Sequence, residues 1–214
     1  MIIVSGGTKG GSGKTTLATN LTVMRSGEGY DVLLIDADDQ ESATDFTIVR
    51  NERLEEGAGY TSIKLTGSQV RTETLRLKNK YQDIIIDVGG RDTQGQRAAL
   101  TIADVFLIPF RPRSLDVWTV GKVCSLIAEM SQANPKLRAF AFINCADPRG
   151  SDNEEAAELL KNKEELSFIN TPLGNRKAFS NAATDGLAVT EFRPEDLKAV
   201  EEITTLYRYV FGIN

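Results

Sequence analysis

A glycine-rich turn near the start of the chain links an apolar run to a helix-length stretch. The apolar run covers residues 2–5, and residues 9–16 read Lys-Gly-Gly-Ser-Gly-Lys-Thr-Thr. Because glycine has no Cβ, such a turn can bring several backbone N–H groups together on phosphate oxygens, and a helix that begins at about Lys14 points its positive end at them. The segment therefore predicts a strand, a phosphate cradle and a helix in succession.

Two side chains of this turn have predicted roles of their own. Lys14 adds a mobile charge for the β- and γ-phosphates of a nucleotide, and Thr15 offers its hydroxyl to Mg²⁺. The general form of the loop has glycine at position 8, but this chain has Thr8 there, and a second lysine, Lys9, follows it. The sequence thus predicts a nucleotide-binding loop with one lysine more than usual.

Composition limits the kind of protein that carries this loop. The length of 214 residues suits one well-buried domain, so we expect residues 1–214 to form a single domain. Histidine is absent, which excludes a histidine base. The net charge of −5 argues against an extensive nucleic-acid-binding surface and leaves room only for local basic patches.

Cysteine usage and hydropathy indicate the compartment. Cys124 and Cys145 stand 21 residues apart, a spacing that predicts neither a disulfide framework nor a zinc or iron–sulfur site. No charged leader precedes the first apolar run, and no run approaches the roughly 18 apolar residues that span a bilayer. We therefore expect a soluble protein of the reducing cytoplasm.

Apolar runs alternate with helix-length stretches along the chain, which is the pattern of a parallel sheet covered on both faces. The predicted fold class is α/β, with a single doubly wound, mostly parallel β-sheet and helices on both faces. The expected strands are Ile2–Ser5, Val32–Ala37, Asp83–Val88, Asp104–Phe110 and Leu137–Asn144, with weaker candidates at Tyr60–Leu65 and Leu166–Asn170. The expected helices are Lys14–Arg25, Ser42–Asn51, Gly67–Asn79, Thr93–Ile102, Ser114–Gln132, Asn153–Asn162, Asn175–Thr184 and Pro194–Val210.

The helix expected at Ser114–Gln132 carries apolar residues at intervals of three to five. We interpret these residues as a stripe that packs against the sheet. They are Leu115, Trp118, Val123, Ile127 and Met130.

A cluster of carboxylates follows the second expected strand. Asp36 and Asp38 point to the same side while the chain stays extended, because strand side chains alternate with period two. Two carboxylates at the carboxyl end of a strand can hold the water shell of Mg²⁺ and orient a water toward a γ-phosphate. The alternative is that Asp38 or Asp39 only caps the following helix.

A third acid reaches the same edge at the end of the expected strand Asp83–Val88. Asp87 is placed to contact Mg²⁺ through water and to sense the γ-phosphate, and the pair Gly89-Gly90 forms a plausible hinge. In the alternative, Asp87 caps the helix that begins near Thr93. The three segments together predict a magnesium nucleotide site at one edge of the sheet.

Taken in order, these segments resemble the ParA/MinD family of ATPases. Residues 9–16 look like the deviant Walker A box of that family, Asp36-x-Asp38-x-Gln40 resembles its second box, and Asp87-Val88-Gly89-Gly90 resembles its Walker B. The spacing matches nearly the whole chain, and the compact length is most like that of the small, ParF-type ParA proteins of plasmid partition. Asp39 stands where the second box usually has proline, and Gly89-Gly90 replaces a more constrained switch sequence.

The resemblance implies an ATPase that binds ATP and Mg²⁺ and forms a homodimer, with Lys9 of each subunit reaching the phosphates bound by the other. It implies further that Asp38 positions the attacking water and that Asn144 contacts adenine, although a turn-forming Asn144 remains an alternative. By the same resemblance Lys9, Lys14 and Asp38 are catalytic, and Asp36, Asp87 and Thr15 serve the metal. The implied nucleotide-binding residues are Gly10, Gly11, Ser12, Gly13, Lys14, Thr15, Thr16 and Asn144.

The implied biological role is partition. In small ParA proteins the ATP-bound dimer binds DNA without sequence preference, which places it on the nucleoid, and a centromere-binding partner of the ParB/ParG kind stimulates hydrolysis. Arg176 and Lys177 lie near the place where relatives carry a DNA-contacting arginine. A solvated surface explains these two residues equally well.

Two other roles remain open. One is a MinD-like ATPase on a membrane, but the end of this chain carries a single cation, Arg208, and we expect Leu206, Val210 and Phe211 to pack against the sheet, so stable membrane association is not expected. The other is a metabolic synthetase with the same loop, for which no substrate cluster is found.

Overall fold

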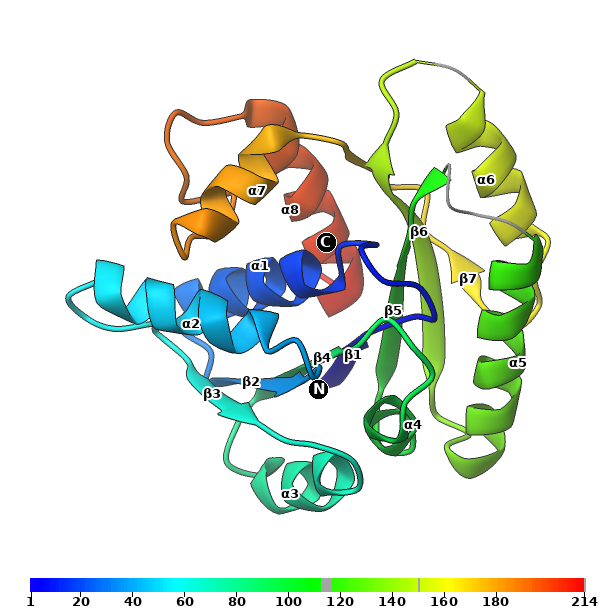
Figure 1. Ribbon diagram of the computed structural model, residues 1–214, viewed down its shortest axis with the longest axis horizontal. Helices are drawn as coiled ribbons and strands as arrows, with labels where there is room; N and C mark the ends of the chain where they lie inside the picture. The colour runs from blue at the N-terminus through cyan, green and yellow to red at the C-terminus, as the bar shows by residue number, and fades with distance from the viewer. Residues whose placement is uncertain (113–116, 150, 214) are drawn as a thin grey trace.

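Continuous apolar runs build the central strands, as expected for a parallel sheet buried on both faces. The computed structural model describes residues 1–112, 117–149 and 151–213, and Figure 1 shows a central sheet with helices on both sides. Within this part of the chain the strand order is β3-β2-β4-β1-β5-β6-β7, with β8 beside β6, and every pairing is parallel. The predicted fold class is confirmed.

The strands agree with the sequence wherever an apolar run continues for several residues. Three of them have the predicted bounds. β8, which with β7 is one of the two shortest strands, was not predicted, because no apolar run marks it. The strands are β1 (Ile2–Ser5), β2 (Val32–Ala37), β3 (Thr61–Lys64), β4 (Asp83–Val88), β5 (Val105–Phe110), β6 (Arg138–Ala146), β7 (Ser167–Phe168) and β8 (Leu173–Gly174).

Helices form one layer on each face of the sheet, and each layer buries its own apolar core (Figure 1). The core on one face includes residues of α3 (Gln69–Leu77), α4 (Gln94–Leu100), α5 (Val117–Ala133) and α6 (Asp152–Lys161). The core on the other face includes residues of α1 (Lys14–Gly27), α2 (Ser42–Arg53), α7 (Lys177–Thr184) and α8 (Leu197–Phe211).

The apolar stripe of α5 differs from the prediction at one residue. Val123, Ile127 and Met130 are buried against the sheet as expected, but Trp118 is 81% exposed. At about 100° per residue, Trp118 lies about 140° around the helix from Val123, which puts it outside the stripe. Assigning Trp118 to the core was therefore wrong. Residues 114–116, including Leu115, lie outside the described residues.

The strand order explains why the predicted motifs meet. β1 lies between β4 and β5, so the chain leaves β1 through the glycine-rich turn at the point where the strand order reverses. In register, Ser5 lies beside Asp87, and Asp87 lies beside Asp36. The carboxyl ends of β1, β2 and β4 therefore deliver the turn and the acids to one edge.

Candidate functional site

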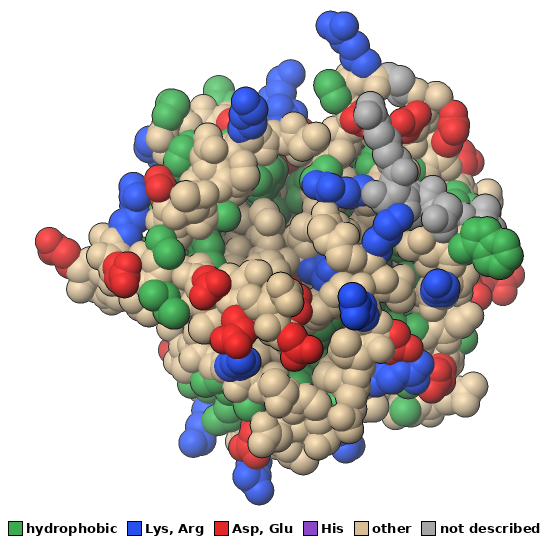
Figure 2. Space-filling model, in the orientation of Figure 1, with side chains coloured by type: hydrophobic (Ala, Val, Ile, Leu, Met, Phe, Trp, Pro, Cys, Tyr) green, Lys and Arg blue, Asp and Glu red, His purple; other side chains and the backbone are tan. Residues whose placement is uncertain are grey.

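A large open cavity lies along this edge, with a volume of about 1140 Å³. Its walls come from the turn of residues 10–16, the segment 38–42, the segment 89–93, the end of β6 and the segment 173–180. In the orientation of Figure 1, the surface shows a central hollow with Lys and Arg side chains to its right and Asp and Glu side chains below it (Figure 2). The cavity thus has a basic and an acidic side.

The glycine-rich turn has a backbone that only glycine adopts easily. Gly11 has φ of 69° and Gly13 has φ of 93°, which is the left-handed region. A Cβ on Gly13 would lie 2.2 Å from Nδ2 of Asn144. Gly13 is the residue before α1, so the N-terminal N–H groups of that helix open onto the cavity. This is the predicted phosphate cradle.

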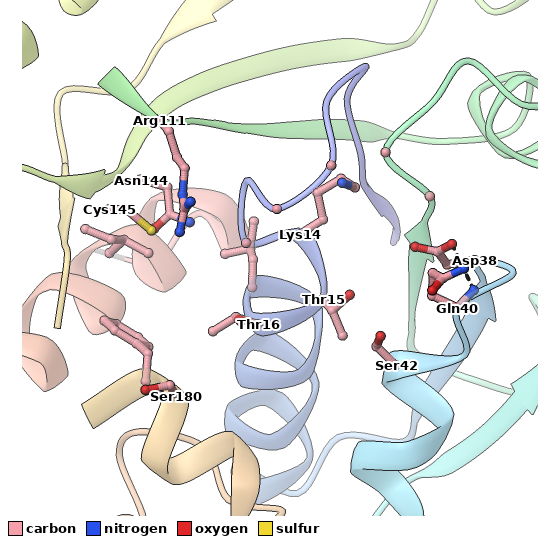
Figure 3. Close-up of a pocket in the computed structure, with 18 of the residues that line it drawn as sticks. Lys14, Thr15, Thr16, Asp38, Gln40, Ser42, Arg111, Asn144, Cys145 and Ser180 are labelled. Atoms are coloured by element: carbon pink, nitrogen blue, oxygen red, sulfur yellow. Dashed lines mark hydrogen bonds between the residues drawn. The ribbon is translucent and has the colours of Figure 1, made fainter. Parts of the chain in front are cut away.

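Lys14 is the buried cation of the cradle. Only 6% of Lys14 is exposed, and its ammonium donates a hydrogen bond of 3.0 Å to the Lys9 carbonyl. Burial lowers the pKa of Lys14, while the carboxylates of Asp87 and Asp38 oppose that shift. In Figure 3, Lys14 and Thr15 lie on the side of α1 toward Asp38, and Thr16 lies on the side toward Asn144. A desolvated ammonium held between carboxylates is suited to receiving phosphate oxygens.

Asp36 fixes the backbone around the second box. Its Oδ2 accepts hydrogen bonds of 2.8 Å from both the amide and the hydroxyl of Thr44, and its Oδ1 accepts one of 3.1 Å from the Asp38 amide. The side chain is fully buried and does not line the cavity. Asp36 therefore ties the start of α2 to the turn at Asp38, and its action on the metal stays a prediction.

Asp38 reaches the cavity itself. Its Oδ1 accepts a bond of 3.2 Å from the Gln40 amide, which closes a local turn, and Figure 3 shows the carboxylate facing the cavity from the β2 side. Neither Asp38 nor Asp39 accepts a capping hydrogen bond from α2, whose preceding residue is Glu41. The helix-cap alternative therefore fails for both residues, and Asp38 remains available for a water molecule.

Asp87 is the least satisfied acid of the site. Both of its carboxylate oxygens are buried without a hydrogen-bond partner of good geometry, and the side chain is fully buried. Burial raises the pKa of Asp87 to about 7, although the nearby Thr15 hydroxyl and Lys14 oppose the shift. It does not cap α4, because Thr93 accepts the capping bond from the Gln96 amide. Unsatisfied buried oxygens beside a phosphate cradle suit a hydrated cation.

The glycine pair after Asp87 permits two close approaches. A Cβ on Gly89 would lie 3.1 Å from Oδ1 of Asp38, and a Cβ on Gly90 would lie 2.5 Å from the Cα of Gly10. The loop after β4 therefore rests on the turn of residues 10–13 backbone to backbone. Any larger residue at position 90 would separate the two loops.

Asn144 supports the cradle from β6. Its Nδ2 donates a bond of 2.7 Å to the Ser12 carbonyl, and the residue is 9% exposed. It also lines the cavity, on the side away from Asp38 (Figure 3). The structure thus gives Asn144 a role in holding the turn, and its contact with adenine stays a prediction.

The two candidate DNA-binding residues lie at the end of the cavity that is lined by residues 173–180. Arg176 donates to Glu202 through Nε at 3.0 Å and through Nη2 at 2.6 Å, and this hydrogen bonding raises the pKa of Arg176. Lys177 is exposed and begins α7. The guanidinium of Arg176 is therefore committed to Glu202, whereas Lys177 faces solvent.

Several cavity residues were not predicted from the sequence. Arg111 extends into the cavity from the end of β5 (Figure 3). The sequence places it in a loop at the carboxyl end of a strand, where α/β sheets bind ligands, but predicts no role for it. The wall at residues 173–180 gave no such signal, since β8 is only two residues long. The unpredicted lining residues include Arg111, Cys145, Leu173, Phe179, Ser180 and Ile203.

The residues fit a nucleotide with magnesium better than a metal alone. Among the described residues no group of three or more Asp, Glu, Cys or His side chains could hold a metal ion. Mg²⁺ prefers to keep several waters and to bind phosphate oxygens together with one or two protein oxygens. Thr15 lines the cavity and Asp87 has two carboxylate oxygens without a hydrogen-bond partner of good geometry, so both residues suit this role, and their action on the metal stays a prediction.

A parallel sheet whose first strand runs through a glycine cradle into a helix, with acids from two neighbouring strands, defines a P-loop nucleotide-binding protein. The sequence profile of the CobQ/CobB/MinD/ParA nucleotide binding domain matches residues 3–189. The chain belongs to this family, which confirms the resemblance drawn from its motifs.

Relatives extend the match to most of the chain. "Maintenance of carboxysome distribution protein A" of Halothiobacillus neapolitanus is 26% identical over 204 residues, which cover 94% of this chain and 92% of that protein. "Protein ParA" of Rhizobium radiobacter is 29% identical over 189 residues, which cover 84% of this chain and 80% of that protein. Both relatives are therefore similar to this chain over most of its length.

Solved structures share the fold at lower identity. An ATP complex of a variant of McdA from Cyanothece has a TM-score of 0.77 at 19% identity and covers 100% of this chain and 96% of its own. A plasmid partition protein from Borrelia burgdorferi B31, solved with AMPPNP, has a TM-score of 0.71 at 20% identity and covers 99% of each chain. Both complexes hold adenine nucleotides within this fold.

Proposed function

We propose that residues 1–214 form one Mg²⁺-dependent ATPase domain of the DNA-partition type. ATP-bound chains pair face to face, the pair binds DNA without sequence preference, and a ParB/ParG-like partner stimulates a slow hydrolysis that releases the DNA. The chain then works in the cytoplasm, on the nucleoid while ATP is bound. The observation that carries the proposal is the exposed Lys9 beside the phosphate cradle, a position from which a cation can reach the nucleotide of a second copy.

The shape of the charged face supports pairing of two identical copies. A two-fold interface requires a surface that complements itself. Arg111 lies on one side of the phosphate cradle and Asp38 on the other (Figure 3). A two-fold axis in the interface, perpendicular to the line between them, would place basic side chains against acidic ones. Lys9 would then approach the site of the second copy.

The position of each side chain in the cavity supports a separate proposed role in ATP hydrolysis. Lys14 would bind phosphate. Thr15 would hold Mg²⁺ through its hydroxyl and Asp87 would hold it through water, and the ion would supply charge neutralisation of the phosphates. Asp38 orients the attacking water, because its carboxylate faces the cavity and its backbone is fixed by Asp36. Asp36 would serve the metal only indirectly. Thr16 and Asn144, on the side of α1 away from Asp38, would contact the α-phosphate and adenine (Figure 3).

The membrane alternative has little support in the last helix. Leu206 is fully buried, Val210 is 6% exposed and Phe211 packs on the same core, so the three apolar residues expected to pack are covered. Leu197 and Tyr209 of the same helix are exposed. No helix within the described ranges is long and apolar enough to cross a bilayer. We therefore favour DNA over lipid as the surface that the ATP-bound form recognises.

The test is binding to an arbitrary-sequence duplex at low salt, with ATP plus Mg²⁺ and with ADP plus Mg²⁺ on one preparation. We expect binding with ATP only, with an affinity that falls steeply as salt rises, because phosphate contacts release counterions. The variant Lys14→Ala, which loses the phosphate charge, should bind no DNA with either nucleotide. Equal or absent DNA binding in the two nucleotide states would contradict the proposal, and anionic liposomes would then be tested.

A second DNA-binding measurement tests Lys177, the exposed one of the two candidate contact residues. Lys177→Ala should weaken DNA binding and make it less dependent on salt, because Lys177 is exposed. Unchanged affinity in Lys177→Ala would remove this residue from the DNA surface.

A further inference from the structure

One carboxylate of α8 holds the far wall of the nucleotide cavity. Oε2 of Glu202 accepts a hydrogen bond of 2.9 Å from the Gly174 amide and one of 3.0 Å from Nε of Arg176. Oε1 of Glu202 accepts a bond of 2.6 Å from Nη2 of Arg176. We call this set of Glu202, Gly174 and Arg176 the Glu202 clamp.

The clamped segment has little support of its own. β8 consists of Leu173 and Gly174 only, and its pairing with β6 is irregular between Asn144 and Ala146. A Cβ on Gly174 would lie 3.0 Å from Nε of Arg176, so the guanidinium lies directly against this backbone. The Glu202 clamp therefore adds to an irregular pairing with β6, in which the Asn175 amide donates to the Ala146 carbonyl at 3.0 Å.

The clamped segment faces the end of the cavity suited to a planar base. Phosphates bind at the start of α1, and beyond them the cavity extends in two directions. Toward Asp38 the wall is acidic. In the other direction Leu173, Phe179 and Ile203 line it together with polar and basic side chains, which include Ser180, Arg176 and Lys177. An apolar slot with a few fixed polar groups is what a nucleobase requires.

We propose that Glu202 is a positioning residue for the base of the bound nucleotide: it contacts no ligand atom but fixes the segment 173–177 against which the base lies. This inference rests on nucleotide binding by the proposed function. The Glu202 clamp would then contribute to affinity for the nucleotide base and to the choice between bases, whereas the glycine-rich turn would bind the triphosphate.

Loss of the Glu202 clamp should disturb the conformation of the cavity wall at residues 173–177 more than the global stability of the fold. The side chains of Arg176 and Glu202 are 26% and 23% exposed, and ion pairs with such access to water add little to global stability. The neighbouring residue Ile203, in contrast, is fully buried in the core and lines the cavity. Packing of its apolar face therefore holds helix α8 in place. The hydrogen bonds of the Glu202 carboxylate instead fix the segment 173–177.

The test compares ATP, GTP and inorganic tripolyphosphate, each with Mg²⁺, in calorimetric binding to three proteins. The variant Glu202→Gln keeps the shape of the side chain but turns N–H donors toward the guanidinium of Arg176. Glu201→Gln is the matched control, because Glu201 is the exposed neighbour of Glu202 on the same helix. Thermal unfolding of each ligand-free protein reports the global fold.

For Glu202→Gln we expect about tenfold weaker ATP binding, a smaller preference for ATP over GTP, and tripolyphosphate binding within twofold of the unsubstituted chain. Glu201→Gln should change none of these. Arg176→Ala should give the same pattern as Glu202→Gln, and the double variant should be no weaker than either, because the two residues act as one unit.

Two results would overturn the inference alone: unchanged ATP affinity in Glu202→Gln, or equal loss of ATP and tripolyphosphate binding, which would indicate a general structural defect. Absence of ATP and tripolyphosphate binding by the unsubstituted chain would instead overturn the proposed function, and the inference with it. The tripolyphosphate arm thus separates the two failures.

Discussion

Gly13 is the residue at which a single methyl group has the largest predicted effect. Its φ of 93° is unfavourable for any other residue, and an added Cβ would lie 2.2 Å from Nδ2 of Asn144. Gly13→Ala should therefore distort the phosphate cradle and weaken ATP binding at least a hundredfold. Gly27→Ala, where an added Cβ meets nothing within 4 Å, is the control and should bind ATP normally. Calorimetric titration with ATP decides between these outcomes.

The buried carboxylate of Asp87 should lower the stability of the ligand-free protein at high pH, although we propose that hydrolysis requires it. Its pKa is raised from 3.8 to about 7 by burial, so folding takes up a proton between these values. The stability contributed by this carboxyl is complete below pH 3.8 and is lost as the pH rises through 7. Asp87→Asn should therefore stabilise the ligand-free protein at pH 8 by on the order of 1–3 kcal/mol, have little effect near pH 4, and impair Mg²⁺-dependent hydrolysis.

Urea unfolding at both pH values measures the effect of Asp87→Asn, with exposed Asp31→Asn as the control. A stability difference between Asp87→Asn and the unsubstituted chain that is the same at pH 4 and pH 8 would contradict a raised pKa.

At the residue scale, sequence reasoning located the glycine-rich turn and the acids but not their partners. The spacing of apolar residues in the sequence places Asp36 and Asp38 at one edge of the sheet. Only the fold shows that the carboxylate of Asp36 accepts hydrogen bonds from Thr44 and from the Asp38 amide. Contacts between residues far apart in the chain, such as Asn144 with Ser12, follow from topology rather than from local pattern. The roles assigned to these residues in catalysis remain predictions.

Among the elements, α2 is fixed to the connection between α7 and α8 by one buried cation. Arg50 is 5% exposed, donates to the carbonyls of Ala58 and Gly186 at 2.8 and 3.0 Å, and forms a two-bond pair with Glu191 at 2.7 and 2.8 Å. Removing this side chain would leave two carbonyls unpaired and the Glu191 carboxylate with only the hydrogen bond from the Ala188 amide. Arg50→Ala should destabilise the protein by about 3 kcal/mol in urea unfolding.

The neighbouring pair of Arg53 and Asp185 is the control for the Arg50 prediction. Its atoms lie 3.3 Å apart and the side chains are 48% and 40% exposed, so Arg53→Ala should lose less than about 1 kcal/mol. Similar losses in the two variants would show that burial does not distinguish these ion pairs.

Strands were predicted correctly from the sequence where a long apolar run marks them, and were missed where no apolar run does. β1, β2 and β4 have the predicted bounds because each is a continuous buried run. β8 was missed because two residues carry no periodicity, and Trp118 was misplaced because intervals of three to five do not fix the phase of a helix. The stripe of Val120, Val123, Ile127 and Met130 has the regular spacing that Trp118 breaks.

For the whole molecule, the decisive prediction concerns Lys9. This residue is exposed at the edge of the cavity, so in the proposed dimer it acts on the nucleotide of the second copy. Lys9→Ala should leave ATP binding by the monomer within about threefold and abolish the ATP-dependent dimer. Sedimentation with ATP in an Asp38→Ala background, in which hydrolysis is predicted to stop, measures the dimer.

Lys80→Ala is the control for Lys9→Ala, because Lys80 is an exposed lysine that precedes β4 and therefore lies at the opposite edge of the sheet. Its dimer should match that of the unsubstituted chain. An undiminished dimer in Lys9→Ala would refute the role across the interface.

The contact of Gly90 with Gly10 has a mechanical consequence. At this point two loops touch through main-chain atoms alone, so no rotamer change can absorb a displacement of either one. We therefore expect that a shift of the loop after Asp87 toward residues 9 and 10 displaces the loop that carries Lys9. The end of β4 and the position of Lys9 are then coupled by steric contact.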